Sequence, residues 1–333
     1  MNNKKLKITL PKGSLHDEVA SFFERAGLKL TFSSKRDYRP SVKDSEIYVK
    51  LLRPQEIPNY LIGENEFDLG ISGKDWVKET NADVEVLLDL EIGGVSIVFC
   101  IPNDWEHINS LDDVLLKFYN DKKVLRISTE YLTLSLDYIK NNKTYKKLYG
   151  DINPLIITPW RKWGKNDKIK IFLSFGATEA KPPEEVDVII DNTATGSTIK
   201  ANNLKIIEVV DTSTAVLIAN KNALKDEWKR EKIKDILVLL KGVIKASKSL
   251  HVFLNVREEN LDIILKSLPA LKRPTISKLA GADSEGWFAI NTIIKKSEFL
   301  SIISILRKYA QGLVVHEPRQ ILPLEEIKNM HKD

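Results

Sequence analysis

The sequence predicts an α/β protein made of two lobes and a separate C-terminal domain. Strands alternate with helices through most of the chain, a pattern typical of α/β layers. The chain is expected to cross between the lobes near residues 102 and 208, which would make the first lobe discontinuous. After residue 248 the elements follow the order β-α-β-β-α-β, the ferredoxin-like split βαβ unit.

These observations give three expected domains. Residues 1–101 with 208–247 form the first lobe, residues 102–207 the second lobe, and residues 248–333 the C-terminal domain. The first two make a hinged clamp with its ligand in the cleft. A length of 333 residues is consistent with two or three domains.

The first lobe begins with a strand, a turn at Pro11-Lys12-Gly13-Ser14 and a helix that ends at Gly27. Pro54 stands where a further helix would start. A Gly-rich turn follows the strand that begins at Phe67 and leads into another helix. The expected elements are strand 6–10, helix 15–26, strand 46–52, helix 54–64, a short strand from 67, and strands 84–88 and 95–101.

The second lobe is expected to contain helix 110–118, strand 124–127, helix 131–141, strands 155–157, 169–174 and 186–190, and helix 199–204. Residues 160–167 are polar and contain Gly164, which predicts an exposed hairpin or flap. Their two tryptophans, Trp160 and Trp163, could equally pack at a corner.

The rest of the chain is expected to form strands 205–210 and 214–219, helix 222–247, strand 250–256, helix 258–268, strands 275–280 and 287–294, helix 297–309, and strand 312–315. The C-terminal unit of roughly 80 residues can bury a modest core of its own. It carries no catalytic group of residues, so a regulatory module and an oligomerisation module are both open.

The most informative stretch runs from residue 186 to residue 200. Its β-branched strand suits a buried parallel position, and the following turn is rich in hydroxyls around Gly196. A strand, such a turn and a helix start together predict an anion site. Asp191 at the rim suits ribose, because a carboxylate accepts from vicinal hydroxyls. The stretch therefore predicts a site for a 5-phosphorylated ribose, although an ordinary turn with Thr as N-cap has the same pattern.

The composition argues against nucleic acid and membranes as binding partners. Hydrophobic residues make up 43% and charged residues 29%, as in ordinary globular proteins, and the net charge is +5. The sequence has no basic arm of the kind that binds nucleic acid. No apolar run reaches the roughly 18 residues that a membrane span needs. Cys100 has no partner for an internal disulfide. No signal-type segment precedes the first strand, so we expect a cytoplasmic protein.

Several stretches in one order resemble the long form of the ATP phosphoribosyltransferase family. They are residues 10–13, 53–58, 68–75, 176–179, 191–204, 214–220, 242–244 and 268–275, which together cover nearly the whole chain. The resemblance implies two lobes like those of type II periplasmic binding proteins and a C-terminal domain like the amino-acid-binding ACT fold.

The implied reaction is the first step of histidine biosynthesis. Phosphoribosyl passes from phosphoribosyl pyrophosphate to N1 of the adenine of ATP, and pyrophosphate leaves with Mg²⁺. The resemblance also implies feedback inhibition by histidine, and a homo-hexamer or a dimer that exchanges with it.

The site residues follow from the loop and the resemblance together. Asp191 is assigned to the ribose hydroxyls, and the 5-phosphate to Thr193, Ala194, Thr195, Gly196, Ser197 and Thr198. Pyrophosphate or triphosphate is assigned to Lys12, Gly13, Arg53, Gly70 and Lys74, although Lys74 could be a solvated surface charge. Glu179 is a candidate for ribose or for a metal-bound water. The histidine site is assigned to Leu271, Thr275 and Gly312.

No His, Cys and Asp cluster has the spacing of metal ligands, so Mg²⁺ is expected to arrive with the phosphates. Two positions depart from the family, which usually has Arg where Ser14 and Ser96 stand. These departures support one rival hypothesis, a catalytically silent paralogue that senses an amino acid. A second rival, a solute receptor, predicts an export signal and no ribose-phosphate loop.

Overall fold

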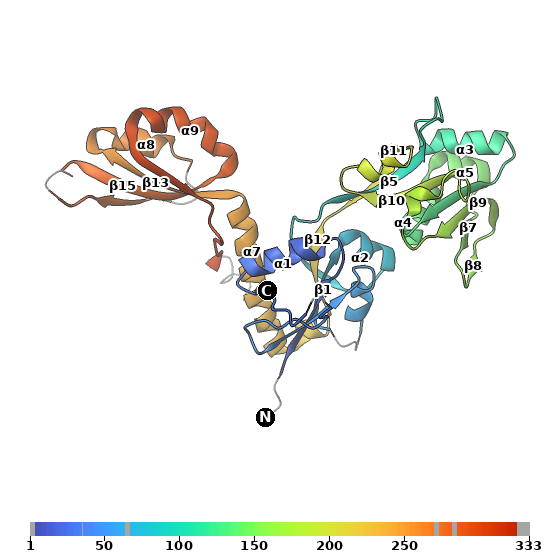
Figure 1. Cartoon of the computed structure of the whole chain (residues 1–333), viewed down its shortest axis with the longest axis horizontal. Helices are drawn as coiled ribbons and strands as arrows, with labels where there is room; N and C mark the ends of the chain where they lie inside the picture. Colours follow the sequence, from blue (N-terminus) through green and yellow to red (C-terminus); the bar gives the residue numbers. More distant parts are fainter. Residues whose placement is uncertain (1–3, 35, 64–66, 270–272, 282–284, 325–333) are drawn as a thin grey trace. The chain divides into compact units, whose positions relative to one another are not determined.

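The computed structural model describes residues 4–34, 36–63, 67–269, 273–281 and 285–324. It divides into two compact units: residues 1–18 with 46–226, and residues 19–45 with 227–333 (Figure 1). In the described part of the chain, no helix is both long enough and apolar enough to cross a membrane.

The first unit contains a five-stranded sheet in the order β2-β1-β3-β12-β4. Its strands are β1 (Leu6–Pro11), β2 (Ile47–Leu52), β3 (Leu69–Gly73), β4 (Glu85–Asp89) and β12 (Ala215–Ala219), and the helix α2 (Lys74–Thr80) follows β3. β1 is parallel to β2 and β3, so the turns after β1 and β2 and the start of α2 lie at the same edge of the sheet. β1, β3 and β12 are almost fully buried, as predicted for α/β layers, whereas β2 alternates between buried and half-buried residues and β4 is half-buried or exposed throughout.

The helix predicted over 54–64 is wrong in extent. The structure has a 3-10 helix, η1, only at Ile57–Leu61. Pro58 is tolerated in the first turn of η1, and Ile62, which is extended at φ −93° and ψ 134°, ends this helix. Residue 64 lies outside the described residues.

The same unit contains a seven-stranded sheet in the order β11-β5-β10-β6-β9-β7-β8. Its strands are β5 (Val95–Pro102), β6 (Leu125–Thr129), β7 (Pro154–Ile157), β8 (Lys162–Trp163), β9 (Asn166–Leu173), β10 (Val188–Thr193) and β11 (Leu204–Ser213). Its helices are α3 (Leu111–Asn120), α4 (Leu132–Asn141), α5 (Lys143–Tyr149) and α6 (Ser197–Ala201). The neighbours β10, β6, β9 and β7 are parallel, so their carboxyl ends meet at one edge.

Long-range pairing extends this sheet beyond residues 102–207. β5 begins at Val95 and pairs with β11, which continues to Ser213 through two irregularities. β10 is parallel to β6 but antiparallel to β5, so the parallel position predicted for strand 186–190 holds on one side only. The division into catalytic lobes stays a prediction.

Single residues account for other differences. The helix predicted over 199–204 is α6 at Ser197–Ala201; Asn203 takes a positive φ of 55°, and Leu204 already begins β11. The helix predicted to start at 222 starts at Glu227, since Asp226 is extended.

The predicted second lobe, residues 102–207, contains one α-helix that was not predicted. Extended Asn142 ends α4, and its side chain accepts from Tyr145 N at 2.8 Å, which starts the unpredicted α5. The hairpin predicted over 160–167 is present but lies earlier: β7 pairs antiparallel with β8, and Asn166 already begins β9.

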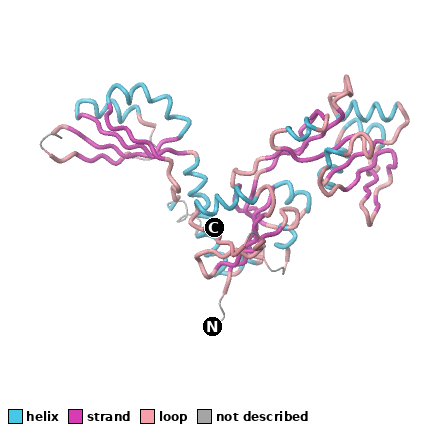
Figure 2. The backbone as a smooth tube through the Cα atoms, in the orientation of Figure 1, coloured by secondary structure: helices cyan, strands magenta, loops and turns pink. Residues whose placement is uncertain are grey.

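The second unit contains most of α1 (His16–Arg25), the long helix α7 (Glu227–Ser247) and the C-terminal domain. The domain follows the order β13 (Ser249–Arg257), α8 (Leu261–Ser267), β14 (Thr275–Lys278), β15 (Trp287–Lys295), α9 (Lys296–Tyr309) and β16 (Ala310–His316). The sheet order is β14-β15-β13-β16 and all neighbours are antiparallel, which confirms the predicted ferredoxin-like order. Both helices cover one face of this sheet, and a core including Val252, Leu254 and Ile302 lies beneath them (Figure 2).

Candidate active site

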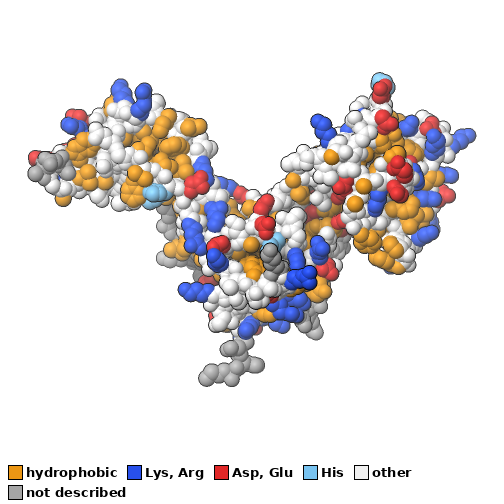
Figure 3. Space-filling model, in the orientation of Figure 1, with side chains coloured by type: hydrophobic (Ala, Val, Ile, Leu, Met, Phe, Trp, Pro, Cys, Tyr) orange, Lys and Arg blue, Asp and Glu red, His pale blue; other side chains and the backbone are white. Residues whose placement is uncertain are grey.

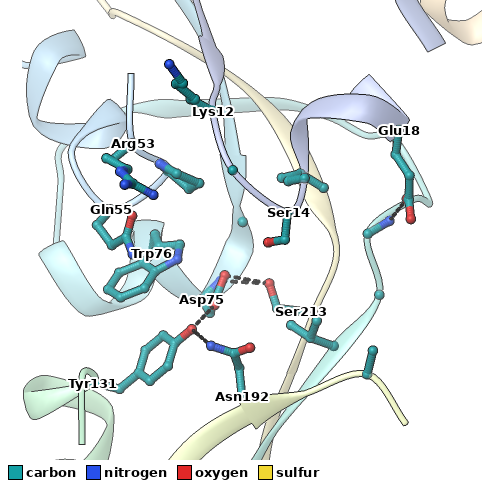
Figure 4. Close-up of a pocket in the computed structure, with 18 residues that line it drawn as sticks. Lys12, Ser14, Glu18, Arg53, Gln55, Asp75, Trp76, Tyr131, Asn192 and Ser213 are labelled. Carbon is teal, nitrogen blue, oxygen red and sulfur yellow. Dashed lines mark hydrogen bonds between the residues drawn. The ribbon is translucent and has the colours of Figure 1, made fainter. Parts of the chain in front are cut away.

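A pocket of about 290 Å³ lies within the first unit (Figure 4). We call it the first pocket. Both sheets contribute to it through the ends of their strands, where functional groups of α/β proteins commonly gather. Its polar lining includes Lys12, Ser14, Glu18, Arg53, Gln55, Asp75, Tyr131, Asn192 and Ser213.

Two cations of this pocket come from neighbouring turns of the five-stranded sheet. Lys12 follows β1 and Arg53 follows β2, and these strands are parallel neighbours. Gly13 has a φ of 104°, and a Cβ added there would lie 3.6 Å from Arg53 Nη1. The guanidinium therefore lies close to the backbone of the turn, and the two side chains suit a polyanion.

Opposite these cations, a hydrogen-bonded group joins the two sheets. Asp75 accepts from Tyr131 Oη at 2.9 Å and from Ser213 Oγ at 2.7 Å, and Asn192 Nδ2 donates to Tyr131 Oη at 3.0 Å (Figure 4). The Trp76 ring stacks on Tyr131 with a centroid distance of 4.5 Å. Burial, and then the Asp75 charge, raise the pKa of Tyr131, so this phenol stays neutral. The group fixes the strand end from which the predicted sugar-phosphate loop begins.

A second pocket, of about 360 Å³, shares Asn192 and Ala194 with the first. It lies at the edge where the carboxyl ends of β10, β6 and β9 meet. Glu130 follows β6, and Gly176 and Glu179 follow β9. The loop contributes Asp191, Asn192, Thr193, Ala194, Thr195, Ser197, Thr198 and Ile199.

The hydroxyls of the loop hold its own backbone in place. Gly196 N donates to Thr193 Oγ1 at 2.8 Å, and Thr195 Oγ1 lies 3.0 Å from Ser197 Oγ. Gly196 takes a φ of 76°, which favours glycine. Because α6 is only five residues long, its dipole is small, and the loop's hydroxyls and backbone N–H groups are the main donors for an anion.

The second pocket is acidic. Burial raises the pKa of Asp191 to about 6, and the charges of Glu130 and Glu179 act in the same direction. A hydrogen bond from Asn192 N, at 2.7 Å, acts against them. Within the described ranges, no group of three or more acidic, His or Cys side chains is arranged to hold a metal. The carboxylates here fit an Mg²⁺ that arrives on phosphates and keeps most of its waters.

The structure brings most of the predicted substrate residues together. The loop residues and Glu179 line the second pocket, apart from Gly196, which shapes the turn; Lys12, Gly13 and Arg53 line the first. Gly70 lines neither pocket. A Cβ added to it would lie 2.7 Å from Ile57 Cγ2, so its role here is close packing. Lys74 is exposed at the start of α2 and also lines neither pocket.

The residues predicted for histidine lie far apart within one domain. Thr275 is in β14 and Gly312 in β16, which are the two edge strands of the C-terminal sheet. The sheet therefore does not bring these two together. Leu271 lies outside the described residues.

Sequence reasoning missed Asp75, Trp76, Glu130, Tyr131, Asn192 and Ser213. One signal could have found several of them. Glu130, Tyr131 and Asn192 stand at or just after the ends of predicted parallel strands, and such ends meet at one edge of a sheet.

Known proteins match over almost the whole chain. A family model described as ATP phosphoribosyltransferase matches residues 53–242, and one described as HisG, C-terminal domain, matches residues 246–317. The ATP phosphoribosyltransferase of Pelotomaculum thermopropionicum is 37% identical over 94% of this chain and 98% of its own. That of Desulforudis audaxviator is 34% identical over 96% of this chain and 100% of its own.

Among solved structures, the ATP phosphoribosyl transferase (HisG:HisZ) complex from Thermotoga maritima is similar in fold. Its TM-score is 0.52 at 22% identity, over 71% of this chain and 96% of that one. The family models and the full-length relatives lead to one conclusion: this chain belongs to the ATP phosphoribosyltransferase family.

Proposed function

We propose that the chain performs the reaction of its family with the donor, phosphoribosyl pyrophosphate, in the second pocket. The loop from Thr193 to Thr198 would hold the 5-phosphate, and Asp191 would accept from the ribose hydroxyls. One observation carries the proposal: the second pocket, lined by hydroxyls and three carboxylates, adjoins the first pocket, which holds Lys12 and Arg53, through Asn192 and Ala194. Phosphoribosyl pyrophosphate carries a phosphate at one end of its ribose and a pyrophosphate at the other, so it needs two adjoining sites.

Lys12 and Arg53 would bind the pyrophosphate as it leaves. The nucleophile, N1 of adenine, has a free lone pair, so no strong base is required. Positive charge instead develops on the ribose as the bond to pyrophosphate breaks. Glu130, Glu179 and Asp191 surround the assigned ribose position and would stabilise that charge. Mg²⁺, carried by the phosphates, would neutralise the departing pyrophosphate.

Histidine inhibition, an ACT-like character of the C-terminal domain and a homo-hexamer or dimer belong to the same proposal. The family match over 246–317 and the ferredoxin-like strand order support a regulatory domain. Because Thr275 and Gly312 lie on opposite edge strands, a histidine site that uses both would draw on two copies of the domain. ATP is a cytoplasmic substrate, so the proposal places the enzyme in the cytoplasm.

A catalytically silent, amino-acid-sensing paralogue is the second candidate, and two positions favour it. Ser14 lines the first pocket, and Ser96 pairs with Thr193 across β5 and β10. Neither supplies a cation for the two polyanions.

The decisive experiment measures phosphoribosyl-ATP by absorbance, with inorganic pyrophosphatase present to remove the product that reverses the reaction. We expect product that requires both substrates and Mg²⁺ and that decreases when histidine is added. A chain that is folded and makes no product at saturating substrates and Mg²⁺ would leave only the silent candidate. Product that is insensitive to histidine would contradict the regulatory part alone.

A further inference from the structure

Two large aromatic side chains of the first unit are unusually exposed. Trp160 is 72% exposed and Phe175 is 70% exposed, more than any other Phe, Trp or Tyr in the described part of the chain. Their ring centroids lie 6.0 Å apart at an interplanar angle of 39°. Scattered exposed aromatics need no explanation, but a contiguous pair beside a site marks a binding surface.

The topology places this aromatic pair at the edge that carries the second pocket. Trp160 lies in the turn after β7, and Phe175 follows β9 by two residues. The turn is tight, because Thr158 N donates to Arg161 O at 2.8 Å and Arg161 N donates to Thr158 Oγ1 at 2.9 Å. Since β7, β9, β6 and β10 are parallel neighbours, the pair and the sugar-phosphate loop lie at one edge of the sheet.

Phe175 is adjacent in the chain to a residue of the second pocket. The next residue, Gly176, lines that pocket, and a Cβ added to it would lie 3.8 Å from Glu130 Oε1. Gly176 and Ala177 both take positive φ angles, 94° and 49°, which turn the chain sharply after the exposed ring. The aromatic pair therefore lies next to the pocket on the side of β9 and β7.

The reaction needs a surface on that side. The nucleophile attacks the anomeric carbon from the face opposite the leaving pyrophosphate, and must come within about 3–3.5 Å of it. The cations assigned to pyrophosphate lie in the first pocket, which adjoins the second at the β10 end. The β9 and β7 side is then the side from which the acceptor approaches.

The acceptor must also be held without blocking its reacting atom. N1 lies on the hydrogen-bonding edge of adenine, so a donor aimed at that edge would occupy the lone pair that attacks. An aromatic ring binds the face of a base instead and leaves its edge free.

We propose that Trp160 and Phe175 form the stacking surface for the adenine of ATP. The inference rests on the proposed function and specifies its acceptor side. It makes these two rings positioning residues for the nucleophile, and leaves Lys12 and Arg53 to the leaving pyrophosphate.

The test compares Trp160→Ala and Phe175→Ala with the wild-type chain in initial-rate measurements with each substrate varied. We expect each change to raise KM for ATP by about 5- to 160-fold, the range that corresponds to loss of one base–aromatic stack. KM for phosphoribosyl pyrophosphate and the melting temperature should stay unchanged, because both rings are exposed. Trp160→Phe keeps a ring and should retain most of the ATP affinity.

Tyr119→Ala is the matched control, since Tyr119 is 48% exposed at the end of α3, on the opposite edge of the same sheet. An unchanged KM for ATP in both alanine variants would overturn the inference and leave the proposed function standing. If the wild-type chain makes no product, equilibrium dialysis with ATP decides instead. If the wild type binds ATP and Trp160→Ala does not, the aromatic pair is a purine site even without the reaction. If both proteins bind ATP equally, or if the wild type binds none, the inference is overturned.

Discussion

Asp191 offers the sharpest test, because its proposed role and its environment oppose each other. Asp191→Asn removes the charge and keeps an oxygen for the Asn192 N–H group. The pKa of Asp191 is about 6 in the folded chain against 3.8 for an ordinary Asp, so the ionised form destabilises the fold. This difference in pKa lowers the free energy of unfolding by about 3 kcal/mol at pH 8, by about half of that at pH 5, and by nothing well below pH 4.

The variant should therefore be more stable than the wild-type chain and bind its donor worse. Urea unfolding of both proteins at pH 8 and pH 5 gives the stability difference, which should shrink at the lower pH. Steady-state kinetics should show a much higher KM for phosphoribosyl pyrophosphate and a nearly unchanged KM for ATP. In the wild type, donor binding should weaken as the pH falls through about 6 and the carboxylate is protonated.

Asp151→Asn, a change at an exposed position of the same unit, controls for net charge. If Asp191→Asn were less stable than the wild type at pH 8, or if its gain in the free energy of unfolding did not depend on pH, ionised Asp191 would not be the group that destabilises the fold. An equal loss of affinity for both substrates would refute the ribose assignment.

Three further outcomes are expected. Arg53→Ala should weaken inhibition by pyrophosphate by about 10- to 100-fold, the loss of a charge-assisted contact, and a product-inhibition series measures it. Gly70→Ala should lower the free energy of unfolding by about 1–3 kcal/mol because the new methyl group overlaps Ile57, while both KM values stay unchanged. Glu130→Gln should lower kcat by about 10-fold or more and change KM for the donor little, since its charge acts on the transition state; a change in KM alone would contradict that role.

The sequence was sufficient for most of the order of elements, apart from α5, and insufficient for the partners of the strands in the sheets. Apolar β-branched runs such as 186–190 are local signals, and each became a strand at nearly its predicted place. The pairing of β5 with β11 joins residues about a hundred positions apart, and no local pattern encodes it. The limits of the seven-stranded sheet therefore could not be predicted.

In the candidate site, too, the residues that are contiguous in the sequence could be predicted and those that the fold brings together could not. The sugar-phosphate loop is contiguous, so its chemistry could be interpreted directly from residues 191–198. The group around Asp75 is not contiguous: Tyr131 is 56 positions away and Ser213 is 138 positions away. Gly70, predicted to bind a phosphate, packs against Ile57 and lines neither pocket; in sequence, a glycine needed for packing looks like a glycine needed for a ligand.

The distribution of charge between the two pockets supports a dissociative transfer. In the proposed arrangement, negative charge would grow on the leaving group beside Lys12 and Arg53 as the bond to pyrophosphate breaks, and positive charge would grow on the ribose beside Glu130, Glu179 and Asp191. Before the bond breaks, the same carboxylates face a polyanion and disfavour its binding. The site therefore favours the transition state over the bound donor, which is the condition for a higher kcat. Hydroxyls rather than cations in the 5-phosphate loop fit this division, because a lysine there would neutralise the carboxylates that the reaction needs.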